Sequence, residues 1–147
     1  MAGRYGYVAA VVAVFGLLAQ GARAQDVQMP ESFKTETDEA KTACETDGGT
    51  FTVDPGTYQV IDVNGDGALD QVLDEGGFSC TTGETLYCSA SGCPVHFIIS
   101  GVESALALQD WKVVNEKGTT FLQAPGDIGT LDFTWNPQTA SWDIRQN

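Results

Sequence analysis

A nine-residue stretch, Asp62–Asp70, constrains the fold of this chain more than any other feature, because it has the spacing of a calcium-binding loop. Oxygen-bearing side chains stand at its positions 1, 3, 5 and 9, and Gly67 at position 6 permits a sharp turn. Ca²⁺ takes six to eight oxygen ligands, which short carboxylate and amide side chains on a tight loop supply. The predicted Ca²⁺ ligands are Asp62, Asn64, Asp66, Ala68 (through its carbonyl oxygen) and Asp70.

The residues on either side of this loop indicate strands rather than the helices of an EF-hand. Segments 58–61 and 71–73 are short and rich in residues that favour strands. Position 12, where an EF-hand has a bidentate Glu, is Leu73. Asp74 follows it and stays open as a further oxygen ligand. The alternative to a metal site is a bare turn, since Asn-Gly and Asp-Gly are also strong hairpin signals.

Residues 1–24 have the pattern of a signal peptide. Arg4 is followed by an apolar run, Val8–Ala19, and then by the small-residue cleavage site Ala22–Ala24, which would leave Gln25 as the new N-terminus. The apolar run is too short to span a bilayer as a helix. We therefore expect a periplasmic or secreted protein with no membrane insertion after cleavage. The alternative is that the segment is retained as an N-terminal anchor.

The charge of the chain limits its partners. Five basic and twenty acidic residues follow residue 24, which gives that part a formal charge of −15. A surface this acidic repels nucleic acids and anionic membranes. It favours cations, a basic protein or a component of the cell envelope as partners.

The chain has four cysteines, an even number, behind an export signal, and this predicts two disulfides. Three pairings are possible, and we favour Cys88 with Cys93 and Cys44 with Cys80. Loop-entropy arguments give about 2 kcal/mol of stabilisation for the short loop and about 4 kcal/mol for the long one. Zinc bound by Cys80, Cys88, Cys93 and His96 is an alternative, but export and the lack of a C-x-x-C motif argue against it.

The N-terminal part predicts a linker followed by one helix. Residues 25–34 are polar and read as a flexible linker. The segment Thr35–Asp47 predicts a helix, with Thr35 or Thr37 as its N-cap and Gly48-Gly49 ending it. Its apolar content is low, so we expect Cys44 to anchor it covalently.

The remainder of the chain predicts short strands separated by turn residues. This pattern indicates a mainly β fold, a small antiparallel β-sandwich or open barrel with one N-terminal helix, as a single domain over residues 35–147. The predicted strands cover 50–53, 57–61, 69–73, 78–80, 86–88, 94–100, 105–114, 119–123, 131–135 and 142–144. We expect the C-terminal hairpins to form the core, through Leu131, Phe133, Trp135, Trp142 and Ile144.

The loop and the cysteines also carry a family resemblance. Segment 58–73 resembles the calcium loop of FG-GAP-type repeats and is similar to dockerin loops, although a helix follows those. More broadly, the loop together with Cys44, Gly48-Gly49, Phe78-x-Cys80, Tyr87-Cys88 and Gly92-Cys93-Pro94 resembles a group of uncharacterised exported proteobacterial proteins. The resemblance covers residues 40–100 well and 101–147 loosely, and Ser89 and Ala90 depart from it. It implies a periplasmic calcium-loop domain and no known activity.

These observations favour a non-enzymatic, exported, calcium-stabilised domain that acts in binding or in envelope structure. His96 is the only histidine, and nothing near it in the sequence resembles a nucleophile elbow. One alternative is a small secreted hydrolase, which should have a concave pocket with shifted pKa values around His96 or an Asp pair. The other is an acidic inhibitor or immunity-type module, which should bind a basic protein in a salt-sensitive way.

Overall fold

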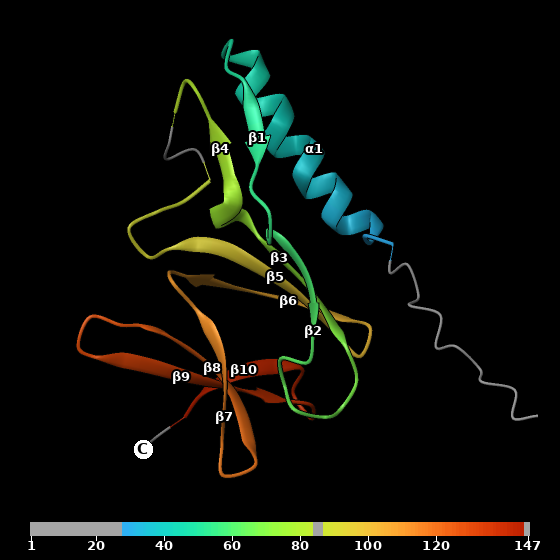
Figure 1. Ribbon diagram of the computed structural model, residues 1–147, viewed down its shortest axis with the longest axis vertical. Helices are drawn as coiled ribbons and strands as arrows, with labels where there is room; N and C mark the ends of the chain where they lie inside the picture. The colour runs from blue at the N-terminus through green and yellow to red at the C-terminus, as the bar shows by residue number, and fades with distance from the viewer. Residues whose placement is uncertain (1–27, 84–86, 146–147) are drawn as a thin grey trace, which may run out of the picture.

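The computed structural model describes residues 28–83 and 87–145, and over these ranges the protein is mainly β with one helix, as predicted. Two four-stranded sheets and one two-stranded ribbon are present in this part (Figure 1). The elements are α1 (Glu31–Thr46), β1 (Phe51–Val53), β2 (Tyr58–Ile61), β3 (Asp70–Asp74), the 3₁₀ turn η1 (Glu75–Gly77), β4 (Phe78–Cys80), β5 (Cys93–Ile99), β6 (Val102–Leu108), β7 (Lys112–Glu116), β8 (Thr119–Pro125), β9 (Thr130–Asn136) and β10 (Ser141–Ile144).

The two larger sheets form a sandwich, and α1 covers the outer face of one of them. The first sheet has the strand order β2-β3-β5-β6 and the second has the order β10-β9-β8-β7, with every pair antiparallel. Helix α1 and the second sheet lie on opposite sides of the first sheet (Figure 1). Among the described residues neither sheet closes into a barrel. The central strand β3 of the first sheet is therefore covered on both faces, and its neighbouring residues Val72 and Leu73 are both buried.

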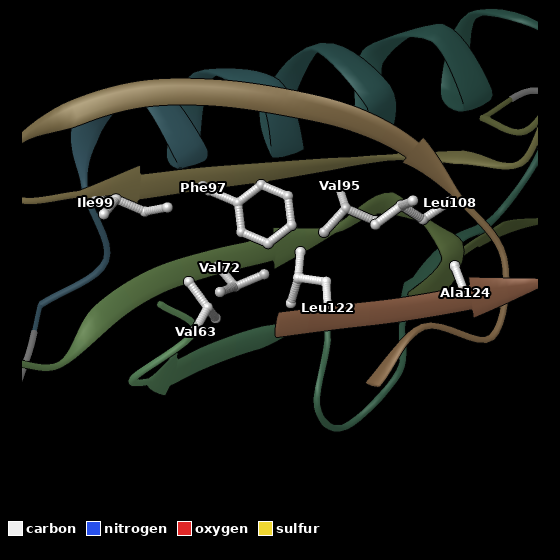
Figure 2. Close-up of a cluster of buried hydrophobic side chains, with 8 residues drawn as sticks. All are labelled: Val63, Val72, Val95, Phe97, Ile99, Leu108, Leu122 and Ala124. Atoms are coloured by element: carbon white, nitrogen blue, oxygen red, sulfur yellow. The ribbon is translucent and has the colours of Figure 1, made fainter. Parts of the chain in front are cut away.

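The main core lies between the two sheets, and strand β5 shows why. Val95, Phe97 and Ile99 alternate along it and are fully buried toward the second sheet, where Leu122 of β8 meets them (Figure 2). The predicted strand over residues 94–100 is confirmed, with each end within one residue of the prediction. The whole cluster consists of Val63, Val72, Val95, Phe97, Ile99, Leu108, Leu122 and Ala124.

The predicted C-terminal core is wrong in part. Trp135, Trp142 and Phe133 are only partly buried and pack against the side of this cluster. Leu131 and Ile144 are 36 % and 60 % exposed. The sequence of these hairpins alternates cleanly, but the inner face of the second sheet is covered chiefly by β3 and β5, so the centre of the core lies nearer the middle of the chain.

Helix α1 begins at Glu31, four residues before the predicted start, so residues 31–34 belong to the helix and not to a linker. Neither of the predicted caps is one: the hydroxyl of Thr35 donates to the carbonyl of Glu31, and that of Thr37 to the carbonyl of Phe33, as helix-interior threonines do. Phe33 is almost fully buried against Leu73 and Phe78 and forms the centre of a second core. The predicted end is confirmed, because the helix stops at Thr46 and Gly48 has a φ of 76°.

Two strand predictions also need correction. The segment 105–114 is divided between sheets, since β6 ends at Leu108 and β7 begins at Lys112. Asp110 between them has a left-handed φ of 44°, where the chain turns from one sheet into the other. Tyr87 and Cys88 lie in no strand, because the disulfide at Cys88 closes a tight turn instead.

The predicted signal peptide, residues 1–24, lies outside the described residues. Within the described ranges, no helix has both the length and the apolar character needed to cross a membrane.

Candidate functional site

The predicted calcium loop connects β2 to β3, so the strand–loop–strand arrangement is confirmed. Gly65 and Gly67 both have left-handed backbone, with φ of 80° and 87°. A side chain at Gly65 would collide with the side chain of Thr120 on β8. Val63, at position 2, is fully buried in the core between the sheets. The loop is therefore anchored in the core by the side chain of Val63, and its backbone at Gly65 packs against Thr120 of the second sheet.

Backbone amides of the loop hold its side-chain oxygens in fixed orientations. The two oxygens of Asp62 accept from the amides of Gly65 (2.6 Å) and Gly67 (2.9 Å). Asp66 Oδ1 accepts from the amide of Ala68 (2.7 Å), and its Oδ2 accepts from Asn64 Nδ2 (2.9 Å). These two hydrogen bonds, that of Ala68 first, lower the pKa of Asp66 and keep it charged.

Asp70 differs from the other acidic residues of the loop because only 2 % of it is exposed. Its Oδ2 accepts from the amide of Val63 (3.0 Å), whereas its Oδ1, which accepts no hydrogen bond from the described residues, is not itself fully shielded from solvent. Burial raises the pKa of Asp70, and the charges of Asp66 and Asp62 raise it further, against the opposing effect of the Val63 hydrogen bond. The loop thus holds a buried carboxylate beside two others without a counter-charge among the described residues.

The predicted ligands are gathered on one turn but are not drawn tightly together. The ligand atoms of Asp62, Asp66 and Asp70 do not all lie within 4.8 Å of one another. In the described residues one group of three side chains meets this criterion, and it lies elsewhere in the fold. Oxygens on opposite sides of a bound Ca²⁺ are roughly 5 Å apart. Ca²⁺ binding therefore requires these side chains to rotate inward and to exchange some of their hydrogen bonds with the loop amides for contacts with the ion. The donor set itself, carboxylate, amide and carbonyl oxygens, is the kind that Ca²⁺ prefers.

Asp74 lies at the far end of β3, roughly 13 Å from Asp70 by strand geometry. Its two oxygens accept from the amide of Gly76 (2.8 Å) and from Trp111 Nε1 (2.7 Å), which connects η1 to the start of β7. It is therefore a structural residue rather than a ligand of the loop. Leu73, at position 12, is fully buried, so the fold replaces the EF-hand Glu with a core residue.

The favoured disulfide pairing is confirmed. Cys44 of α1 is bonded to Cys80 of β4, and Cys88 is bonded to Cys93. No free cysteine remains in the described residues, which excludes the cysteine zinc site. Two disulfides in a chain of this size indicate an oxidising compartment.

One group of metal-ligating side chains escaped the sequence analysis: Glu36 of α1, Glu75 of η1 and His96 of β5. The nearest pair in it is His96 Nε2 and Glu75 Oε1, 2.7 Å apart. This hydrogen bond raises the pKa of His96, against the opposing effect of burial, and the charges of Glu75, Glu36 and Glu103 raise it further. The sequence did hold one indication of this group: Glu36 lies three residues after Phe33, on the same buried face of the helix. The prediction missed it because it placed the start of the helix at Thr35 instead of Glu31.

Comparison of the chain with protein-family models, curated proteins and solved structures finds no match. The resemblance of the loop to FG-GAP-type and dockerin loops therefore rests on the residues of the loop and stays a prediction.

Proposed function

We propose that this protein is an exported, non-enzymatic binding or envelope domain whose fold is stabilised by Ca²⁺ at the Asp62–Asp70 loop. Its two disulfides and its acidic composition support an extracytoplasmic location. The loop would hold the ion through Asp62, Asn64, Asp66 and Asp70, with the carbonyl of Ala68. The ion would act as a structural counter-charge.

The observation that carries this proposal is the burial of Asp70. A buried carboxylate is costly unless a counter-charge or several hydrogen bonds satisfy it, and Asp70 has one such bond, from Val63. Asp62 and Asp66 add repulsion from the same turn. A divalent cation reduces both costs, since its two positive charges offset two of the three negative charges and it can bind Oδ1 of Asp70.

The position of the loop extends the effect of the ion beyond the hairpin. Val63 places one side of the loop in the core, and Gly65 rests against Thr120 of the second sheet. Ordering the loop would therefore stabilise the contact between the two sheets as well as the β2–β3 connection.

The calcium proposal predicts a melting temperature that depends on Ca²⁺. Without a Glu at position 12, we expect an affinity of roughly 10⁻⁵ to 10⁻³ M, as in extracellular modules. A ligand at a hundred times Kd stabilises the folded state by about 2.7 kcal/mol. Differential scanning calorimetry should show a lower melting temperature in EDTA, full recovery in millimolar Ca²⁺ and weak recovery in Mg²⁺, which demands tighter octahedral geometry.

Asp66→Ala should abolish the Ca²⁺ response, because it removes a central ligand from an exposed loop. Asp127→Ala is the matched control: Asp127 is also an exposed aspartate in a loop, between β8 and β9, and its variant should respond as the wild type does. If wild type melts at the same temperature in EDTA and in millimolar Ca²⁺, and titration calorimetry detects no binding, the loop is a hairpin turn and the proposal fails.

The hydrolase alternative has less support. A cavity of about 280 Å³ does border His96, and Ser104 lies beside it. The hydroxyl of Ser104, however, accepts a hydrogen bond from Trp142 Nε1 (3.3 Å), on the side of the sheet that faces the second sheet. Ser104 is therefore poorly placed as a nucleophile for His96, which favours a binding role for the domain.

A further inference from the structure

The group formed by Glu36, Glu75 and His96 is assembled by the tertiary fold and not by a local turn. The three residues come from a helix, a 3₁₀ turn and a strand. One ligand atom of each lies within 4.8 Å of those of the other two. Three ligands that come from separate elements keep fixed relative positions only if each element is anchored to the rest of the protein. Here α1, η1 and β5 are each anchored.

Helix α1 presents Glu36 inward because of the spacing of its buried residues. Phe33, Glu36, Ala40 and Cys44 follow one another at intervals of three and four, which places them on one face of a helix. Phe33 is packed in the second core, and Cys44 is bonded to Cys80. Both ends of the stripe are therefore fixed to the rest of the protein, with a carboxylate between them at a position that packing alone would fill with an apolar side chain.

Strand β5 presents His96 to the same space. His96 pairs with Leu73 of β3, so the two side chains share the face of the sheet that α1 covers. The ring of Phe33 stands edge-on to the imidazole with ring centres 6.5 Å apart. Glu75 follows β3 directly and meets the imidazole at 2.7 Å, with only 14 % of its side chain exposed. Packing and the hydrogen bond thus limit the movement of both groups.

We propose that Glu36, Glu75 and His96 bind a divalent transition-metal ion of the Zn²⁺ class, at a site separate from the calcium loop. An imidazole nitrogen favours Zn²⁺ and its first-row neighbours over Ca²⁺ and Mg²⁺, which prefer oxygen alone. Two carboxylates neutralise the charge of the ion. The distances also suit it: Zn²⁺ binds nitrogen and oxygen at about 2.0–2.2 Å, so ligand atoms already within 4.8 Å of one another need small side-chain movements to reach it.

Three protein ligands leave one position of a tetrahedral ion open. The cavity of about 280 Å³ beside the group is lined by Glu36 and His96, and also by Glu103 of β6. The open position can therefore hold a water molecule or an oxygen of a small ligand from this cavity. Glu103 adds a third negative charge near the imidazole, which favours a cation here.

The test is titration calorimetry of the full chain with ZnCl₂, without an affinity tag, in millimolar Ca²⁺ so that any calcium site is filled. We expect one Zn²⁺ per chain from this site. Glu36→Gln and His96→Gln should each weaken it by roughly 10- to 100-fold or more, the loss known for removing even an outer partner of a metal ligand. Glu36→Gln guards against loss of folding, because Glu36 makes no hydrogen bond or ion pair through its side chain within the described residues.

Two controls separate this site from general attraction of Zn²⁺ to an acidic protein. Glu39→Gln makes the same charge change on an exposed position of α1, and Asp66→Ala disables the calcium loop; both should bind Zn²⁺ as the wild type does. His96 is the only histidine, so its ring signals in NMR spectra should shift on Zn²⁺ addition. Absence of Zn²⁺ binding, an equal loss in Glu39→Gln, or an unmoved His96 ring would overturn the proposal. Each result is independent of whether Ca²⁺ binds the loop.

Discussion

At the scale of single residues, Gly49 shows how closely the chain is fitted around its long disulfide. A Cβ atom at this position would lie 2.5 Å from Cys80 Sγ, 2.7 Å from Cys44 Sγ and 2.6 Å from the hydroxyl oxygen of Thr82. Carbon atoms do not approach sulfur this closely without displacing it. Because the two sulfurs are bonded to one another, neither can move away alone.

Gly49→Ala should therefore destabilise the protein by about 1–3 kcal/mol, the usual cost of overpacking a well-filled site. Chemical denaturation of the oxidised protein measures this. The neighbouring Gly48 has open space around it but a left-handed φ of 76°, which Asn tolerates. Gly48→Asn should cost no more than about 1 kcal/mol, because Asn adopts this conformation more readily than most residues do. Equal and small effects of the two variants would show that the disulfide yields easily.

At the scale of elements, α1 depends on Phe33 for its N-terminal half and on the disulfide for its C-terminal half. Phe33→Ala should cost about 3–5 kcal/mol, since the ring is almost fully buried against Leu73 and Phe78. Because Cys44 still holds the other end, hydrogen exchange should quicken in the first turns of α1 more than in the sheets. Thr35→Ala, on the exposed face of the same turn, should change stability by no more than about 0.5 kcal/mol. A uniform loss of protection in both sheets would contradict this division.

The sequence predicted the loop and most strands well because their signals are local. Strand–loop–strand follows from alternation and from the spacing of Asx and Gly residues between 58 and 73. The start of α1 was harder, because residues 31–34 are polar except for Phe33 and offer no cap with a side-chain hydrogen bond. Phe33 is the only apolar residue that indicates a helix there. Its role becomes clear only in the fold, where it packs against Leu73 of β3 and Phe78 of β4.

At the scale of the whole molecule, the sandwich class was predictable and the arrangement of its layers was not. Nothing local marks Asp110 as the point where the chain leaves one sheet for the other. The helix that covers the outer face of β3 and β5 also decides which side of β5 can form a polar site. His96 lies under α1 because this N-terminal helix packs against that face of the sheet. The contact of His96 with Glu36 and Glu75 therefore depends on tertiary packing, which the spacing of residues in the sequence does not reveal.

The disulfide connectivity has a consequence for how the protein matures. Each bridge joins cysteines that are consecutive in the sequence, 36 and 5 residues apart. If the protein is exported as proposed, a chain that crosses a membrane from its N-terminus exposes Cys44 and Cys80 before the other pair. If Cys88 and Cys93 close first instead, the two remaining cysteines can only bond to one another. Both orders of oxidation lead to the native pairing. The bridges that interrupt them are the four non-native ones, which join Cys44 or Cys80 to Cys88 or Cys93.

Maturation should therefore need an oxidant but no thiol–disulfide isomerase. Disulfide mapping of the protein exported by cells that lack the isomerase should give the same two bridges, at undiminished yield, as in cells that have it. Accumulation of any bridge that joins Cys44 or Cys80 to Cys88 or Cys93 in such cells would contradict the expectation. In such a protein, the order in which the cysteines become available is sufficient to select the native disulfides.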